Sequence, residues 1–181
     1  MLGKFGRKAI DPKGFSYQQT MYRIKDPALT IPFYQKHFGM TCIAERHFPQ
    51  WKFSLYFLAT LPAGTELPFA PDSDEAMVHL NQISYTVLEL THNHGTETDP
   101  AFAHHNGNTD PRGFGHVGFI VDDVVTFCDG LLQEGVRFQK KLSDGNMNNI
   151  AFVLDPDNYW IEILPRSKAF PATAVAGKPS F

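Results

Sequence analysis

Alternating or continuous apolar stretches predict six strands along the chain, and two longer stretches carry apolar residues at helical spacing. Strand, helix, strand, strand is the order in each half, and we expect one more strand directly after each helix. The two halves therefore predict a duplicated βαβββ module and an α+β fold. The predicted strands are 17–26, 51–59, 84–93, 113–123, 148–156 and 158–164, and the predicted helices are 30–40 and 124–138.

The ends of both helices carry recognisable signals. Thr30 is expected to cap the first helix, with Pro32 in its first turn, and Asp123 is expected to cap the second. Gly39 and Gly135 stand where a helix commonly ends in a left-handed residue. Such glycines at matching places support the duplication.

The chain divides at two long loops, 61–77 and 94–111, which are rich in polar and turn-forming residues and show no apolar periodicity. We expect no secondary structure in either. The predicted divisions are an N-terminal arm 1–14, a first module 15–98, a connecting loop 99–111, a second module 112–166 and a C-terminal tail 167–181.

Composition narrows the class of protein. With 181 residues and 43% apolar content, the chain can bury the core of one compact domain or two very small ones. A net charge of −3 gives no reason to expect nucleic acid or an anionic membrane, and no apolar run approaches the ~18 residues of a membrane span. The two cysteines, Cys42 and Cys128, form no disulfide framework, which fits a reducing compartment such as the cytoplasm.

Strand alternation singles out four side chains that can bind a metal. Gln19 and Glu89 lie on the first and last strands of one module, and His116 and Glu162 lie on the corresponding strands of the other. Each of them alone is more often a core, surface or ion-paired residue. If the modules pair about a pseudo-twofold axis, all four can converge on one concave surface. A carboxylate such as Glu162 in an apolar strand needs compensation of this kind.

Four motifs carry a resemblance to a known family. QQTMYRIKD, ELTHNHGTE, HNGNTDPRGFGH and DPDNYWIEIL resemble the glyoxalase I (lactoylglutathione lyase) family of the vicinal-oxygen-chelate superfamily, over roughly 15–165. The resemblance implies barrel-like mixed sheets of eight strands formed by paired modules. It also implies a homodimer with sites at the subunit interface, where Gln19 and Glu89 of one chain meet His116 and Glu162 of the other.

One imidazole, two carboxylates and one amide suit a divalent ion of borderline hardness, whereas a closed structural zinc site would favour cysteines. The resemblance implies zinc, with nickel or cobalt as substitutes. The implied substrate is the hemithioacetal of glutathione and methylglyoxal, which is converted into S-lactoylglutathione by proton transfer from C1 to C2 through an enediolate. The resemblance makes Glu162 the principal base, and Glu89 the second carboxylate, which holds the metal and serves the other enantiomer.

The resemblance also assigns substrate contacts. Asn146 departs from it, because close relatives carry a lysine there, whereas Gly145 and Met147 keep the pattern of a loop that covers the substrate. The implied glutathione contacts are Arg23, Asn93, Arg112, Lys140, Gly145 and Met147, and the implied lining of the pocket for the aldehyde-derived group is Met21, Phe48, Leu55 and Phe57. For Leu55, core packing is an equally good interpretation.

Four histidines and one cysteine are not expected to take part in the function. The histidines in and beside the second loop are expected to be solvated, with the first of them braced near Glu89. These histidines are His92, His94, His104 and His105. Cys128 is expected to be a small buried residue and not a nucleophile, because no partnered base is evident.

Two alternative functions remain open at this point. Another metalloenzyme of the superfamily, such as an epimerase, would share the proton transfer but would not need the arginines. An extradiol dioxygenase needs two histidines and one carboxylate around iron, and Gln19 in the first ligand position disfavours it. A metal-free module that sequesters a small molecule would place apolar residues at the four positions.

Overall fold

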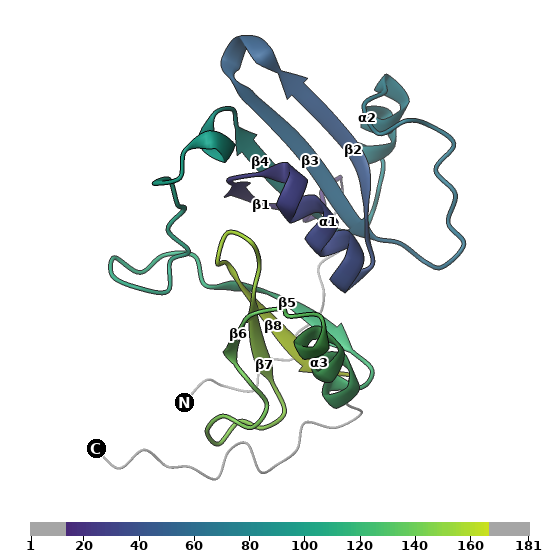
Figure 1. The fold of residues 1–181 in the computed structure, drawn as a ribbon. Coiled ribbons are helices and arrows are strands. Elements are labelled where there is room, and N and C mark those ends of the chain that lie inside the picture. The colour runs from purple at the N-terminus through teal and green to yellow at the C-terminus, as the bar shows by residue number, and fades with distance from the viewer. Residues whose placement is uncertain (1–13, 167–181) are drawn as a thin grey trace, which may run out of the picture.

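The computed structural model describes residues 14–166, which form two four-stranded sheets, each with a helix packed against it (Figure 1). The predicted tail 167–181 and nearly all of the predicted arm 1–14 lie outside the described residues. The first module contains β1 (Gln19–Ile24), α1 (Pro27–Phe38), β2 (Met40–Phe48), β3 (Phe53–Thr60), α2 (Asp74–Leu80) and β4 (Val87–Asn93). The second contains β5 (His116–Val121), α3 (Val124–Gln133), β6 (Phe138–Lys140), β7 (Ala151–Leu154) and β8 (Trp160–Pro165).

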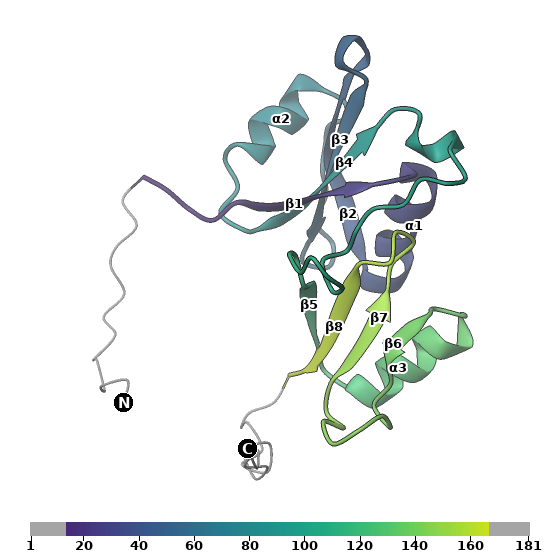
Figure 2. The same ribbon diagram turned by 90° about the vertical axis from the view of Figure 1, so that its left-hand side faces the viewer.

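Both sheets have the same topology. Their strand orders are β1-β4-β3-β2 and β5-β8-β7-β6, with the first pair of each sheet parallel and the other pairs antiparallel. This confirms the duplicated βαβββ plan and the extra strand after each helix. The two sheets are separate in Figures 1 and 2, so within this one chain they do not close into a barrel.

The predicted start of the first helix is wrong. α1 begins at Pro27 and is capped by Asp26, whose carboxylate accepts a hydrogen bond of 2.8 Å from the backbone N–H of Ala28. Thr30 lies inside the helix and is fully buried, and its hydroxyl donates to Asp157 Oδ2 at 3.0 Å. Pro32 is likewise inside the helix and not in its first turn.

The other predicted helix signals are confirmed. Asp123 caps α3 and accepts hydrogen bonds from the backbone N–H groups of Val125 and Thr126. Gly39 and Gly135 have φ values of 61° and 75°, which are in the left-handed region that favours glycine.

The two loops predicted to lack secondary structure each contain a short helix. Ser73 accepts a hydrogen bond of 3.2 Å from the N–H of Ala76 and so caps α2, which buries Ala76 and Leu80 against the first sheet. A single 3₁₀ turn spans Thr96–Thr98. Both elements are too short to give the periodic pattern on which the prediction depended.

One apolar core joins the modules. It contains Tyr22, Tyr34 and Leu90 of the first module together with Ile161 and Ile163 of the second. Figure 2 shows α1 lying between the first sheet and the second module. No helix within residues 14–166 is long and apolar enough to cross a membrane. Cys128 is buried as predicted, and burial raises the pKa of its thiol.

Candidate functional site

The face of the first sheet that bears Glu89, here called the Glu89 face, collects most of the predicted ligands of the first module. Across the strands, Met21 of β1 is opposite Glu89 of β4, which is opposite Phe57 of β3. Residues that are opposite one another share a face, and the face repeats every second residue. The predicted residues on the Glu89 face are Gln19, Met21, Arg23, Phe48, Leu55, Phe57, Glu89 and Asn93.

Gln19 and Glu89 contact one another directly. The Gln19 amide nitrogen donates a hydrogen bond to Glu89 Oε2, which leaves the amide oxygen as a potential metal ligand. Glu89 is 8% exposed, and its burial raises the pKa of its carboxyl, although the bond from Gln19 acts in the opposite direction. A bound cation would compensate the cost of ionising this carboxyl.

His116 and Glu162 form the equivalent contact in the second module. Nε2 of His116 lies 3.2 Å from Glu162 Oε2, and the Glu162 side chain is 18% exposed. Gly118 stands beside Glu162, and a Cβ atom there would be in van der Waals contact with Leu164 Cδ1 at 3.4 Å and with Glu162 Oε2 at 3.9 Å. Phe152 lies opposite Glu162 on the same face of the second sheet, and its ring centroid is 5.3 Å from that of His116.

The two pairs occupy equivalent positions. In the first sheet Gln19 is opposite Val87, two residues before Glu89. In the second sheet His116 is opposite Trp160, two residues before Glu162. The register of the parallel pairs is thus identical, and the duplication supplies one neutral donor and one carboxylate from each module.

Within one chain the four side chains remain two separate pairs. The described residues contain no cluster of three or more histidine, cysteine or acidic side chains that could hold a metal. A groove of about 650 Å³ lies between the modules, and none of the four lines it. One imidazole, two carboxylates and one amide suit zinc or a similar ion, but within one chain the two pairs do not meet.

The predicted carboxylate-binding residues lie in different surroundings. Arg23 is opposite Thr91 on the Glu89 face. Arg112 is 80% exposed in the loop before β5, with its Nε 3.6 Å from Asp110 Oδ1. This loop is closed by two hydrogen bonds, from Gly113 N–H to the Gly107 carbonyl at 3.0 Å and from the Asn108 amide to the Gly115 carbonyl at 2.7 Å.

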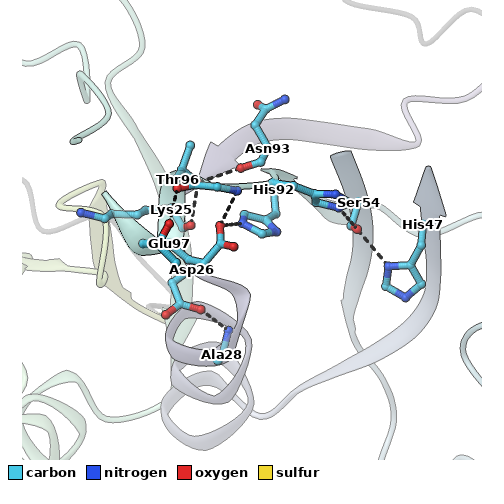
Figure 3. Close-up of polar contacts among 12 residues, drawn as sticks. Lys25, Asp26, Ala28, His47, Ser54, His92, Asn93, Thr96 and Glu97 are labelled. Carbon is cyan, nitrogen blue, oxygen red and sulfur yellow. Dashed lines mark hydrogen bonds and ion pairs between the residues drawn. The ribbon is translucent and has the colours of Figure 1, made fainter. Parts of the chain in front are cut away.

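Asn93 ends β4 beside a polar cluster that fixes its backbone (Figure 3). The Thr96 hydroxyl donates to the carbonyls of Asn93 and Lys25 at 2.9 and 2.8 Å. In Figure 3 the Asn93 side chain points away from this cluster.

Lys140 lies at the end of β6, and its ammonium forms hydrogen bonds with backbone carbonyls. Nζ donates to the carbonyls of Lys141, Met147 and Ile150 at 3.1, 2.8 and 3.0 Å. These contacts close the 141–150 loop, in which Gly145 has a φ of +68° and the Met147 side chain is 55% exposed.

The prediction that the four histidines are solvated is wrong for His92 and His104. His92 lies on β4, is 6% exposed, and its Nε2 lies 2.8 Å from Glu97 Oε2 (Figure 3). The alternation along β4 places it on the face opposite Glu89. His94 contacts the Ser54 hydroxyl at 2.8 Å. His104 is partly buried and stacks on Tyr159, with ring centroids 6.5 Å apart. His94 and His105 are exposed as predicted, and His105 Nε2 lies 3.1 Å from the Thr109 hydroxyl.

Sequence reasoning missed some residues of the Glu89 face. Thr91 lies between Glu89 and Asn93 and is 7% exposed, and within residues 14–166 its hydroxyl has no hydrogen-bond partner. The i, i+2 alternation placed Thr91 on this face but could not show that its hydroxyl is unsatisfied. Trp51 and Phe53 stack with Phe48 at the end of the face, which extends the predicted apolar lining.

Residues 16–163 match the family described as the Glyoxalase/Bleomycin resistance protein/Dioxygenase superfamily. The chain belongs to this superfamily. Among its relatives, a lactoylglutathione lyase of Pseudomonas putida is 47% identical over 150 residues, which cover 83% of this chain and 84% of that protein. Glyoxalase I of Saccharomyces cerevisiae is 41% identical over 175 residues. That match covers 94% of this chain but 52% of the yeast protein, so the chain spans about half the length of the yeast relative.

Solved structures of the superfamily share the fold. A glyoxalase I of Leishmania major, described as trypanothione-dependent, matches with a TM-score of 0.60 at 26% identity, over 84% of this chain and 87% of that one. Glyoxalase I of Zea mays matches with a TM-score of 0.61 at 25% identity, over 85% of this chain and 46% of that one.

Proposed function

We propose that this chain is a metal-dependent lactoylglutathione lyase that converts the hemithioacetal of glutathione and methylglyoxal into S-lactoylglutathione. The observation that carries the proposal is the equivalent register of Gln19 with Glu89 and of His116 with Glu162. Relatives that are 41–47% identical and bear the names lactoylglutathione lyase or glyoxalase I support it. The proposed role is detoxification of methylglyoxal in the cytoplasm.

The complete site requires two copies of the chain. We infer that Gln19 and Glu89 of one copy face His116 and Glu162 of a second copy in a homodimer. The separation of the two pairs within one chain supports this arrangement, because neither pair alone supplies enough ligands. These four side chains would hold zinc, or nickel or cobalt in its place. The ion would act as a Lewis acid that stabilises negative charge on the substrate oxygens.

Glu162 is the proposed base. Its carboxylate removes the proton from C1, the C–H electron pair forms the C1–C2 double bond of the enediolate, and the same carboxylate returns the proton to C2 as the hydroxyl proton of the C1 oxygen passes to the C2 oxygen. The partial burial of Glu162 beside Phe152 and Trp160 limits access of water to the proton in transit. Glu89 is the second carboxylate, which binds the metal and serves the other enantiomer.

The rest of the substrate would lie along the Glu89 face. Arg23 and Arg112 suit the carboxylates of glutathione, because a guanidinium can bind a carboxylate through two hydrogen bonds. We add Thr91, whose buried hydroxyl lies between Glu89 and Asn93 and would gain a partner from the substrate. The remaining proposed contacts are Asn93, Lys140, Gly145 and Met147 for glutathione, and Met21, Phe48, Leu55 and Phe57 for the aldehyde-derived group.

Thioester formation from methylglyoxal tests this function. Purified protein is assayed with glutathione and with other thiols, before and after chelation and after zinc is restored. We expect S-lactoylglutathione to form with glutathione, to stop after chelation and to resume with zinc. Full activity of the metal-free protein would rule out the metal mechanism. A metal-loaded protein that is inactive with every thiol would point to another reaction of the superfamily, such as an epimerisation.

A further inference from the structure

Asn106 is followed by Gly107 in the loop that leads from the first module to the second, and this is the one Asn–Gly pair in the sequence. In such a pair the backbone nitrogen of glycine can attack the side-chain carbonyl carbon of asparagine, because glycine has no side chain to obstruct the approach. The attack closes a five-membered succinimide ring and expels ammonia. The hydrogen bonds of the loop decide whether the folded chain promotes this attack.

The Asn106 side chain is folded back over the following peptide group. Its Oδ1 accepts a hydrogen bond of 2.9 Å from the backbone N–H of Asn108, the residue directly after Gly107. This N–H polarises the side-chain carbonyl and can stabilise negative charge on Oδ1, as the donors of an oxyanion hole do. Nδ2 donates at 2.8 Å to the carbonyl of Asn158, which fixes the other side of the amide.

His105 supplies a base at the attacking nitrogen. The N–H of Gly107 donates to Nδ1 of the His105 ring at 3.2 Å, so this ring nitrogen carries no proton. Nε2 of the same ring lies 3.1 Å from the Thr109 hydroxyl, and it carries the proton of the neutral ring. A neutral imidazole whose lone pair is directed at the N–H is the form that can remove the proton.

We propose that Asn106 is a self-modification site, at which His105 acts as the base in the deamidation of Asn106. Nδ1 of His105 takes the amide proton of Gly107, the nitrogen forms a bond to Asn106 Cγ, and the C=O electron pair moves to Oδ1. The pair then returns to form the carbonyl and the Cγ–Nδ2 bond breaks. Nδ2 takes the proton from the imidazolium and leaves as ammonia, so His105 is neutral again.

Water from the solvent completes the modification. A water molecule adds to one of the two carbonyl carbons of the succinimide, and the ring nitrogen takes back a proton as its bond to that carbon breaks. Addition at Cγ gives aspartate at position 106. Addition at the backbone carbonyl carbon gives isoaspartate, in which the main chain runs through Cβ and Cγ and is one methylene longer.

Both products disturb the loop. A carboxylate at position 106 cannot donate to the Asn158 carbonyl, which Nδ2 of Asn106 now contacts at 2.8 Å. The longer main chain of isoaspartate has little room, because a Cβ atom on Gly107 would lie 2.0 Å from the Phe114 carbonyl oxygen. Deamidation should therefore displace Arg112 and raise the KM for the hemithioacetal, a consequence that rests on the proposed function.

The first test follows the modification itself and needs no activity. Full-length protein is incubated at neutral pH, and Asn106 is followed by mass spectrometry and by release of ammonia. We expect Asn106 to deamidate faster in the folded protein than in a synthetic peptide of residues 101–112. We expect His105→Gln, whose amide can accept the same hydrogen bond but is too weak a base, to slow the reaction at least ~10-fold. His47→Gln changes an exposed histidine outside this loop, and it is the control that should leave the rate unchanged.

Two results would overturn the proposal. A rate in the folded protein at or below that of the peptide would show that the loop protects Asn106. Equal rates in the wild type and in His105→Gln would exclude His105 as the base. Thr109→Val removes the acceptor that fixes the proton on Nε2 and should also slow deamidation, so it provides the comparison if His105→Gln does not fold.

A second test measures the consequence for activity. Asn106→Asp reproduces the aspartate product, and its KM for the glutathione hemithioacetal should be about tenfold above that of the wild type, because a loop contact is lost. An unchanged KM in this variant and in the deamidated protein would exclude the effect on Arg112. If the wild type turned over no hemithioacetal, the proposed function would fail, while the mass change at Asn106 would still decide whether the site modifies itself.

Discussion

The Tyr34 hydroxyl donates a hydrogen bond of 3.0 Å to Asp155 Oδ2 and so joins α1 of the first module to the turn before β8 of the second. Both side chains are fully buried. The other carboxyl oxygen of Asp155 accepts bonds of 2.9 Å from the N–H groups of Asp157 and Tyr159. One carboxyl thus shapes the turn that leads into the strand of Glu162 and fastens the two modules together.

Tyr34→Phe should destabilise the fold. The change removes one partner of Asp155 and one of the buried Tyr22 hydroxyl, and a buried polar group left without its partner costs about 1–3 kcal/mol. Urea unfolding at constant pH measures the loss. The matched control is Tyr17→Phe, which deletes the same hydroxyl at a site that is 71% exposed and should change stability by less than about 0.5 kcal/mol. Equal losses of unfolding free energy in the two variants would show that the buried hydrogen bond of Tyr34 does not stabilise the fold more than an exposed hydroxyl does.

Stability should also depend on pH through Asp155. Burial, followed by the negative charge of Asp157, raises the pKa of Asp155 from 3.8 to about 7. Between about pH 4 and 7 the Asp155 carboxyl therefore keeps a proton in the folded state that the unfolded state has released. The stabilisation from this bound proton decreases as the pH rises over this range and is lost once the pH has passed about 7. The titratable groups that face this carboxyl from the surrounding elements are Tyr22, Tyr34, Asp157 and Tyr159.

Asp155→Asn isolates this effect. Its side chain keeps the size but does not titrate. Between pH 5 and 8 the urea midpoint of the wild type should fall relative to that of the variant. A difference between the two proteins that is constant over this range would contradict the assigned pKa shift.

The loop that carries Arg112 depends on Gly107. This residue has a φ of +83°, and a Cβ atom there would lie 2.0 Å from the Phe114 carbonyl oxygen. Gly107→Ala should open the loop, destabilise the protein by about 1–3 kcal/mol and raise the KM for the hemithioacetal by moving Arg112. Gly113→Ala in the same loop meets nothing within 4 Å and is the control. Similar melting temperatures and KM values for the two variants would exclude the steric explanation.

Strand faces were predictable because a strand has a period of two and one side of each strand is buried. Ile161 and Ile163 are fully buried while Glu162 between them is not, and the same alternation places Gln19 and Glu89 together. The four candidate ligands, and most residues of the Glu89 face, therefore followed from pattern and motif alone.

Features decided by long-range contacts were not predictable. Asp26 and Thr30 are both good N-cap residues, and Asp157, far along the chain, decides between them by accepting the Thr30 hydroxyl. His104 is partly buried because its ring stacks on that of Tyr159. The local sequence contains neither partner.

Thr91→Val should separate stability from activity. Replacing a buried hydroxyl that has no partner in the described residues with an isosteric methyl group should leave the free energy of unfolding unchanged or raise it. The same change should lower kcat/KM by about tenfold, because the proposed hydrogen bond to the substrate is lost. Thr91→Ser keeps the hydroxyl and should retain activity. Full activity in Thr91→Val, measured beside its thermal unfolding, would remove Thr91 from the substrate contacts.

Glu162→Gln should keep the fold and lose turnover. The amide has the shape of the carboxylate but cannot accept the C1 proton, and general-base catalysis typically contributes about 10²–10⁴-fold to a rate. We therefore expect kcat to fall at least ~100-fold while far-UV circular dichroism and the unfolding midpoint stay close to those of the wild type. Glu134→Gln, which changes a carboxylate on the surface 2.9 Å from Lys36 Nζ, is the control and should retain full turnover. Zinc content is measured on each sample, because a variant that has lost its metal would be inactive for a different reason. A zinc-loaded Glu162→Gln protein with a rate near that of the wild type would show that another group removes the proton, and Glu89 would be the next residue to replace.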